Sequence, residues 1–93
     1  MRKKTSEKLL KCVDDILSSL EMFRNFKGNS YISAKINNLC SDNMAALEKN
    51  SDSIKNKEYL ELLDKFKESV SQISVGDAAE ISKRLKELIS ESV

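Results

Sequence analysis

Apolar residues recur at alternating steps of four and three along much of this 93-residue chain. In the first third, the positions that follow this spacing are Leu9, Val13, Ile16, Leu20 and Phe23. In the second half, they are Tyr59, Leu63, Phe66, Val70 and Ile73. This period places apolar side chains on one face of an α-helix, and the sequence contains no proline that would interrupt it. The pattern therefore predicts an all-α protein.

The first break in the helical pattern is centred on Gly28. It is one of only two glycines in the chain, and glycine readily adopts the left-handed conformation that ends many helices. Asn29 or Ser30 can then cap the next helix through a side-chain oxygen. The first helix would itself be capped by Thr5 or Ser6. We therefore expect a helical hairpin that turns at Gly28.

Two further breaks are expected in the second half of the chain. The segment 50–53 gathers residues whose side chains compete with the backbone for hydrogen bonds, and the second glycine lies in the segment 74–76. Asp77 and Glu80 have the spacing of a capping box. These breaks predict a single domain over residues 1–93, an antiparallel up-down four-helix bundle built on the N-terminal hairpin. Its helices are expected at about residues 5–26, 30–49, 54–73 and 77–90.

The pattern leaves two features of this architecture open. Residues 51–53 either break the helix or continue it, and the last two helices either pack on the first hairpin or extend from it. At about fourteen residues, the last helix would be marginal on its own in water, which favours packing.

Cysteine placement and the N-terminal region bear on the cellular location. Cys12 and Cys40 lie among apolar positions, which favours buried reduced thiols over a disulfide. The basic start is followed by Asp14 and Asp15 before a long apolar run develops, so we expect no cleaved leader. No segment has the ~18 consecutive apolar residues of a membrane span. We expect a cytoplasmic protein, or one exported without a cleaved signal peptide.

The sequence offers little for catalysis. Histidine is absent, and histidine is the commonest general base and metal ligand. Both glycines are isolated, so no glycine-rich phosphate loop is present. Acidic residues lack the Glu-x-x-His spacing of helical metal sites, and we interpret them as solvent-facing: Asp14, Asp15, Glu58, Glu61 and Asp64. We therefore predict that the protein is not an enzyme and has no cofactor or metal site.

Basic residues form two small groups in a chain with a net charge of +1. The N-terminal group is Arg2, Lys3, Lys4, Lys8 and Lys11, and the second is Lys83, Arg84 and Lys86. The balanced charge makes nucleic-acid binding an unfavoured alternative. The aromatic residues are interpreted as core residues rather than as base-stacking platforms: Phe23, Phe26, Tyr31, Tyr59 and Phe66.

The turn itself resembles a known family. Phe26-Lys27-Gly28-Asn29-Ser30-Tyr31, followed by Ser33-Ala34-Lys35, is similar to the turn of the Trp-x-Gly family of small type VII secretion proteins and its Leu-x-Gly relatives. The resemblance implies two antiparallel helices joined at this turn, a helical protein partner, and export without a cleaved leader. Phe26 stands where the family has tryptophan, and Leu63 stands where its export signal would have an acidic residue after Tyr59.

These features predict a non-enzymatic protein–protein interaction module of bacterial or phage type. One version is the secretion-associated partner protein that the resemblance implies. A second is an immunity-type or inhibitor-type bundle that occludes a toxin, enzyme or receptor, and a third is a small regulator associated with nucleic acid. A homo-oligomer is also compatible with the pattern. The expected partner-binding residues are Phe26, Gly28, Tyr31, Lys83, Arg84 and Lys86.

Overall fold

The computed structural model describes all 93 residues, and every regular element in it is helical. The α-helices are α1 (Lys3–Met22), α2 (Ser30–Leu39), α3 (Ser41–Lys49), α4 (Ser51–Ile54), α5 (Lys57–Ser71) and α6 (Val75–Glu91). A 3-10 turn, η1 (Arg24–Phe26), follows α1. The prediction of an all-α protein is therefore confirmed.

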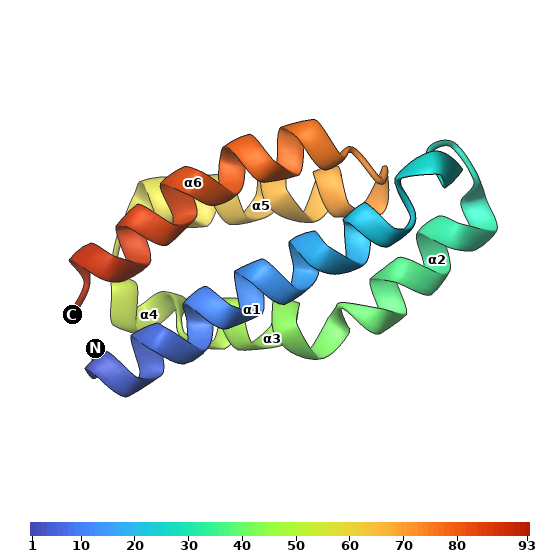
Figure 1. Ribbon diagram of the computed structural model, residues 1–93. Helices are drawn as coiled ribbons and strands as arrows, with labels where there is room; N and C mark the ends of the chain where they lie inside the picture. Colours follow the sequence, from blue (N-terminus) through green and yellow to red (C-terminus); the bar gives the residue numbers. More distant parts are fainter.

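The longer helices lie side by side in alternating directions (Figure 1). α1 packs mainly against α6 and α3, and α5 packs mainly against α6 and α2. The last two helices therefore pack on the first hairpin instead of extending from it. Figure 1 shows η1 and the α5–α6 turn at one end of the molecule and both termini at the other. At that second end, the Met1 ammonium donates to the carbonyl of Ser92 at 3.1 Å.

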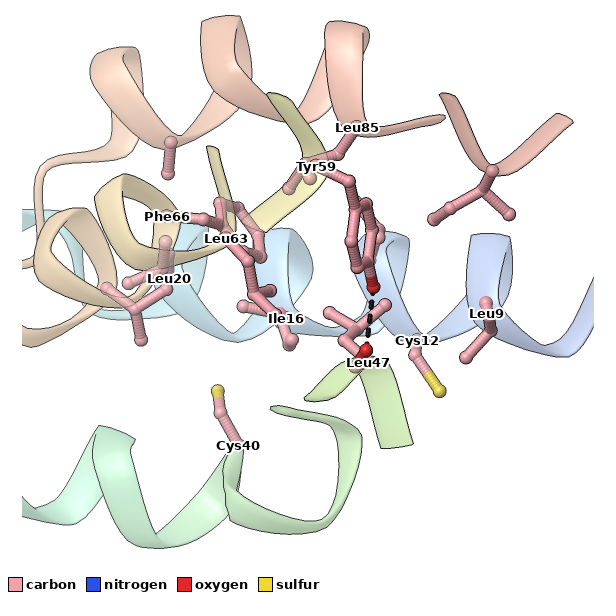
Figure 2. Packing of buried hydrophobic residues seen from close by; sticks show 14 of the residues in the cluster. Leu9, Cys12, Ile16, Leu20, Cys40, Leu47, Tyr59, Leu63, Phe66 and Leu85 are labelled. Carbon is pink, nitrogen blue, oxygen red and sulfur yellow. Dashed lines mark hydrogen bonds between the residues drawn. The ribbon is translucent and has the colours of Figure 1, made fainter. Parts of the chain in front are cut away.

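One continuous core fills the space between the helices (Figure 2). The apolar positions that recur at steps of four and three provide half of it, and Tyr59 and Phe66 are fully buried. The Tyr59 hydroxyl donates to the carbonyl of Leu47 at 2.7 Å, which joins α5 to α3 inside the core. Burial raises the pKa of Tyr59 to about 12. The interpretation of Tyr59 and Phe66 as core residues is confirmed.

The predicted helix at 30–49 is not continuous. It is divided at Cys40, which ends α2 and precedes α3 with φ −93° and ψ 0°. The surrounding stretch is rich in Asn, Ser and Asp, whose side chains bond to nearby backbone groups. Ser41, for example, donates its hydroxyl to the carbonyl of Asn38 at 2.9 Å. The prediction of one continuous helix here is wrong because local side-chain bonds and the burial of Cys40 favour a bend.

α3 ends at Lys49, as predicted, and Asn50 separates it from the short helix α4, which contains residues 51–53. A second break follows α4 at Lys55 and Asn56, and Lys55 has left-handed dihedral angles (φ 49°, ψ 43°). Asn56 caps α5 by accepting hydrogen bonds from the N–H groups of Glu58 and Tyr59 at 2.8 and 3.3 Å. The helix predicted at 54–73 is therefore shorter at both ends, because it lies between this cap and the turn after Ser71.

Both terminal helices begin earlier than predicted. The N-cap of α6 is Ser74, not Asp77, and the Ser74 hydroxyl donates to the Asp77 carboxylate at 2.9 Å. Asp77 thus lies in the first turn of α6, where its negative charge interacts favourably with the positive end of the helix dipole. α1 begins at Lys3, so Ser6 lies inside the helix and its buried hydroxyl donates to the carbonyl of Ile89 at 3.5 Å. The predicted capping box at Asp77 is wrong, and so is the predicted cap at Thr5 or Ser6, because the N-cap of α1 is Arg2.

Candidate functional site

The turn between α1 and α2 is built by three local features. Phe23 ends α1, η1 follows, and Gly28 then takes φ +89° in the left-handed region. No atom lies within 4 Å of a Cβ added at Gly28, so glycine is required by the backbone angle and not by space. The Asn29 side chain caps α2 by accepting the N–H of Ile32 at 3.1 Å. The predicted left-handed Gly28 and the cap at Asn29 are both confirmed.

This turn exposes apolar side chains. The exposed fraction is 76% for Met22, 46% for Phe26 and 77% for Tyr31. Phe23 is half-buried beneath them, and its ring centroid lies 6.3 Å from that of Phe26 at an interplanar angle of 57°. We call Met22, Phe23, Phe26 and Tyr31 the aromatic tip. The interpretation of Phe26 and Tyr31 as core residues is wrong, because both side chains are exposed.

The remaining exposed large apolar residues do not form a comparable group. They are Leu39, Leu60 and Val93, and they lie on α2, on α5 and at the C-terminus. Single exposed apolar residues of this kind are normal on a protein surface. The aromatic tip is different because its residues are close in sequence and meet at one turn.

Three cations accompany the aromatic tip. The Lys35 ammonium lies over the ring of Phe23, 5.9 Å from its centroid. Arg24 is paired with Glu21 at 2.5 Å on an exposed surface, while Lys27 takes part in no ion pair. No Asp or Glu occurs between Glu21 and Asp42. The surface around the tip is therefore both apolar and basic.

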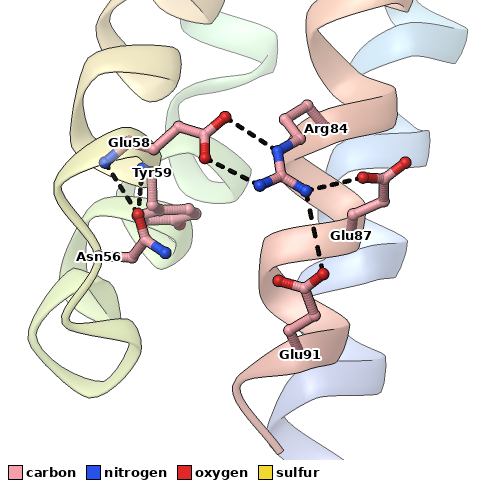
Figure 3. A network of polar contacts seen from close by, with 6 residues as sticks. All are labelled: Asn56, Glu58, Tyr59, Arg84, Glu87 and Glu91. Atoms are coloured by element: carbon pink, nitrogen blue, oxygen red, sulfur yellow. Dashed lines mark hydrogen bonds and ion pairs between the residues drawn. The ribbon is translucent and has the colours of Figure 1, made fainter.

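Two of the three cations of the second predicted group, Arg84 and Lys86 on α6, bind carboxylates of the same chain, and Figure 3 shows the contacts of Arg84. Arg84 bonds the carboxylate of Glu58 through two nitrogens at 2.9 Å each, and that of Glu87 at 2.8 Å. The hydrogen bonds that Arg84 donates lower the pKa of Glu58, and the same bonds to Glu58 and Glu87 raise the pKa of Arg84. Lys86 is paired with Asp14 on α1.

Only Lys83 in this group is exposed and takes part in no ion pair. The two sets of expected partner-binding residues do not form one surface, because Lys83, Arg84 and Lys86 lie on the second half of α6, away from the α1–α2 turn. Arg84 and Lys86 link α6 to α5 and α1 through these ion pairs. We therefore take the aromatic tip as the candidate site.

Elsewhere in the molecule, the cysteine thiols are buried and the acidic side chains do not gather into a site. Cys12 and Cys40 are free thiols in the core, and burial raises the pKa of both. A groove of about 330 Å³ lies between α2, α3 and α5, with Cys40, Met44 and Val70 among its lining residues. No three His, Cys, Asp or Glu side chains converge as a metal site would require. None of the helices is both long enough and apolar enough to cross a bilayer.

Neither a protein-family model, nor a curated protein, nor a solved structure matches the chain. The fold and the exposed side chains describe a small all-α protein whose α1–α2 turn is aromatic and basic. Met22 and Lys35 belong to this surface but were not among the expected partner-binding residues. The absence of acidic residues between Glu21 and Asp42 is the sequence signal that could have indicated Lys35.

Proposed function

We propose that this protein is a non-enzymatic interaction module that binds another protein through the aromatic tip. The observation that carries the proposal is the joint exposure of Met22, Phe26 and Tyr31 at one turn. Aromatic residues and methionine are enriched in protein–protein interfaces. Clustered exposed apolar side chains have a cost in solubility, so they commonly mark binding surfaces.

Local contacts connect this surface to the helices that carry it. We treat α2 and α3 as one arm bent at Cys40, so that the chain is an antiparallel up-down four-helix bundle whose first turn carries the tip. Gly28 and the cap at Asn29 fix the turn, and Phe23 anchors it against the core. A binding surface that is already ordered loses less conformational entropy when a partner binds.

The residues of the turn favour one version of this function. The Phe26-x-Gly28 turn that resembles the Trp-x-Gly family lies at the centre of the exposed surface, which supports a secretion-associated partner protein. An occluding inhibitor that used Lys83, Arg84 and Lys86 has less support, because Arg84 and Lys86 already bond to carboxylates of the same chain. The secretion version includes export without a cleaved leader.

The test compares two matched double variants. Phe26→Ser with Tyr31→Ser removes the aromatic tip, and Leu39→Ser with Leu60→Ser removes two exposed apolar residues elsewhere. Tagged versions are expressed in the cells that naturally make the chain, and complexes are isolated by affinity and size exclusion. We expect one protein at near-equal molar amount with the unmodified chain and the control, and its loss with the tip variant.

The site of contact is checked on the isolated complex. Backbone amide chemical shifts of the labelled chain should change on binding around residues 22–35 and remain unchanged on the second half of α6. A partner retained equally by the tip variant would contradict the proposal. Isolation of the chain alone from every lysate and culture medium would contradict it as well.

A further inference from the structure

The charge of the chain is divided unequally between the tip and the rest. Residues 22–41 include Arg24, Lys27 and Lys35 and no acidic residue, so this segment has a net charge of +3. The whole chain has a net charge of +1, so the other residues together have a net charge of −2. The positive charge is therefore concentrated in the segment that contains the exposed aromatic residues, and Glu21, which pairs with Arg24, is the acidic residue that flanks it.

The three cations are available to a partner. Neither Lys27 nor Lys35 takes part in an ion pair, and the Lys35 ammonium lies over the ring of Phe23. Arg24 has one exposed partner, Glu21, and exposed pairs of this kind contribute little to stability. A carboxylate from another molecule can therefore replace Glu21 or bind beside it without disturbing the fold.

We infer that the aromatic tip recognises an acidic segment of a partner protein. An apolar side chain of that segment packs on Met22, Phe26 and Tyr31, while its flanking Asp or Glu residues face Arg24, Lys27 and Lys35. The inference rests on the proposed function and adds the chemistry of the partner. Complementary charge at an interface raises the association rate and excludes partners of the wrong sign.

Charge and ring geometry favour an acidic protein segment over other occupants. A second copy of the chain that docked by its own tip would bring like charges together. Anionic membrane surfaces are usually bound by clusters of about four to eight cations, more than the three present here. Single-stranded nucleic acid stacks successive bases on several open aromatic faces along a basic groove, whereas here Lys35 lies over Phe23 and Phe26 is tilted by 57° against it, which leaves Tyr31 as the one widely exposed ring.

The test uses synthetic peptides as probes. Fluorescent peptides share one set of leucine and phenylalanine positions and carry Glu, Gln or Lys at all other positions. We expect the Glu peptide to bind at least about tenfold more tightly than the Gln peptide, and the Lys peptide not to bind. This preference should weaken as the salt concentration rises, because the charges involved are exposed.

Two charge-reversal variants of equal size provide the control. Lys27→Glu with Lys35→Glu should abolish the preference for the Glu peptide, whereas Lys3→Glu with Lys4→Glu at the opposite end should preserve it. Circular dichroism and thermal unfolding show whether each variant keeps its helices. If the tip reversal unfolds the chain, the single variant Lys27→Gln, on an exposed side chain, should still reduce the preference.

The outcomes separate this inference from the proposed function. Equal binding of the Glu and Gln peptides, lost in Phe26→Ser with Tyr31→Ser, would overturn the acidic partner and leave the tip as a binding surface. Binding of no peptide overturns the inference, while the complex isolated from cells still decides the proposed function. Tighter binding to phosphatidylserine vesicles or to a single-stranded oligonucleotide, or tip-dependent dimers in sedimentation, overturns it in favour of those occupants.

Discussion

Two turns lie at the same end of the molecule (Figure 1), and one exposes its apolar side chains whereas the other buries its own. The α1–α2 turn uses Gly28 as its left-handed residue and leaves Phe26 and Tyr31 in solvent. The α5–α6 turn uses Ile73 as its left-handed residue, with φ 55°, and buries it to 1% exposure. The second turn is explained by folding alone, whereas the exposed aromatics of the first contribute nothing evident to the core.

The α5–α6 turn shows how strongly burial can act. The N–H of Ser74 donates to the carbonyl of Ser69 at 2.9 Å, and the N–H of Ile73 donates to that of Val70 at 3.1 Å. These are the two hydrogen bonds of a Schellman motif, whose left-handed position usually holds glycine. An L-residue there costs about 1–2 kcal/mol, and full burial of an isoleucine offsets this by about 1.5–3 kcal/mol.

The largest expected effect tests whether the burial of Ile73 offsets the strain of its left-handed backbone. Ile73→Ala keeps the left-handed strain and removes most of the buried side chain, so it should lower the free energy of unfolding by about 2–4 kcal/mol. Urea unfolding followed by circular dichroism measures it. A loss below about 1 kcal/mol would mean that Ile73 does not secure the turn, and the contrast with the aromatic tip would disappear.

The next effect concerns the glycine of the other turn. Gly28→Ala should lower the free energy of unfolding by about 1–2 kcal/mol, because alanine disfavours a positive φ although space for its Cβ is available. Gly76→Ala is the matched control. Gly76 lies in the first turn of α6 with free space around it, so alanine there should be neutral or stabilising. Equal losses at both positions would refute the role given to the Gly28 backbone angle.

A third residue with a left-handed backbone, which has an exposed side chain, extends the comparison between the two turns. Lys55 has φ 49° between α4 and α5, and its side chain is exposed. Lys55→Gly relieves about 1–2 kcal/mol of left-handed strain without removing a buried side chain. The greater freedom of glycine in the unfolded chain costs about 0.5–1 kcal/mol, so stability should rise by about 0.5–1 kcal/mol. The midpoint of urea unfolding provides the measurement. A decrease would show that the lysine stem packs more closely than its exposure indicates.

Sequence reasoning succeeded where a local rule governs the structure. Helical periodicity identified the core face, and the turn chemistry of Gly28 and Asn29 predicted the position of the turn and the cap of α2. The predicted end of the first helix at residue 26 is wrong, because α1 ends at Met22 and a 3-10 turn covers Arg24–Phe26. It failed at Ile73 and Cys40, where the decisive term is burial against helices distant in sequence. No local propensity would have selected isoleucine for a left-handed position.

The candidate site could be predicted only in part. The aromatic-x-Gly turn indicated Phe26, Gly28 and Tyr31 as a surface, but the period did not show which aromatic side chains would be left outside the core. On α6, the sequence showed three cations and could not show that Glu58 and Asp14 bind two of them. Pairs between distant helices depend on the relative rotation of those helices, which a single helical period does not determine.

The smallest expected effect on stability is the most informative for function. Tyr31→Ser removes a side chain that is 77% exposed, so the free energy of unfolding should change by less than about 0.5 kcal/mol. Urea unfolding measures this, with Tyr59→Ser as the buried counterpart that should lose several times more. A loss above about 1 kcal/mol at Tyr31 would mean that the tip packs as part of the fold. An unchanged stability together with lost partner binding would mean that Tyr31 is not required for folding and that its exposed ring serves recognition.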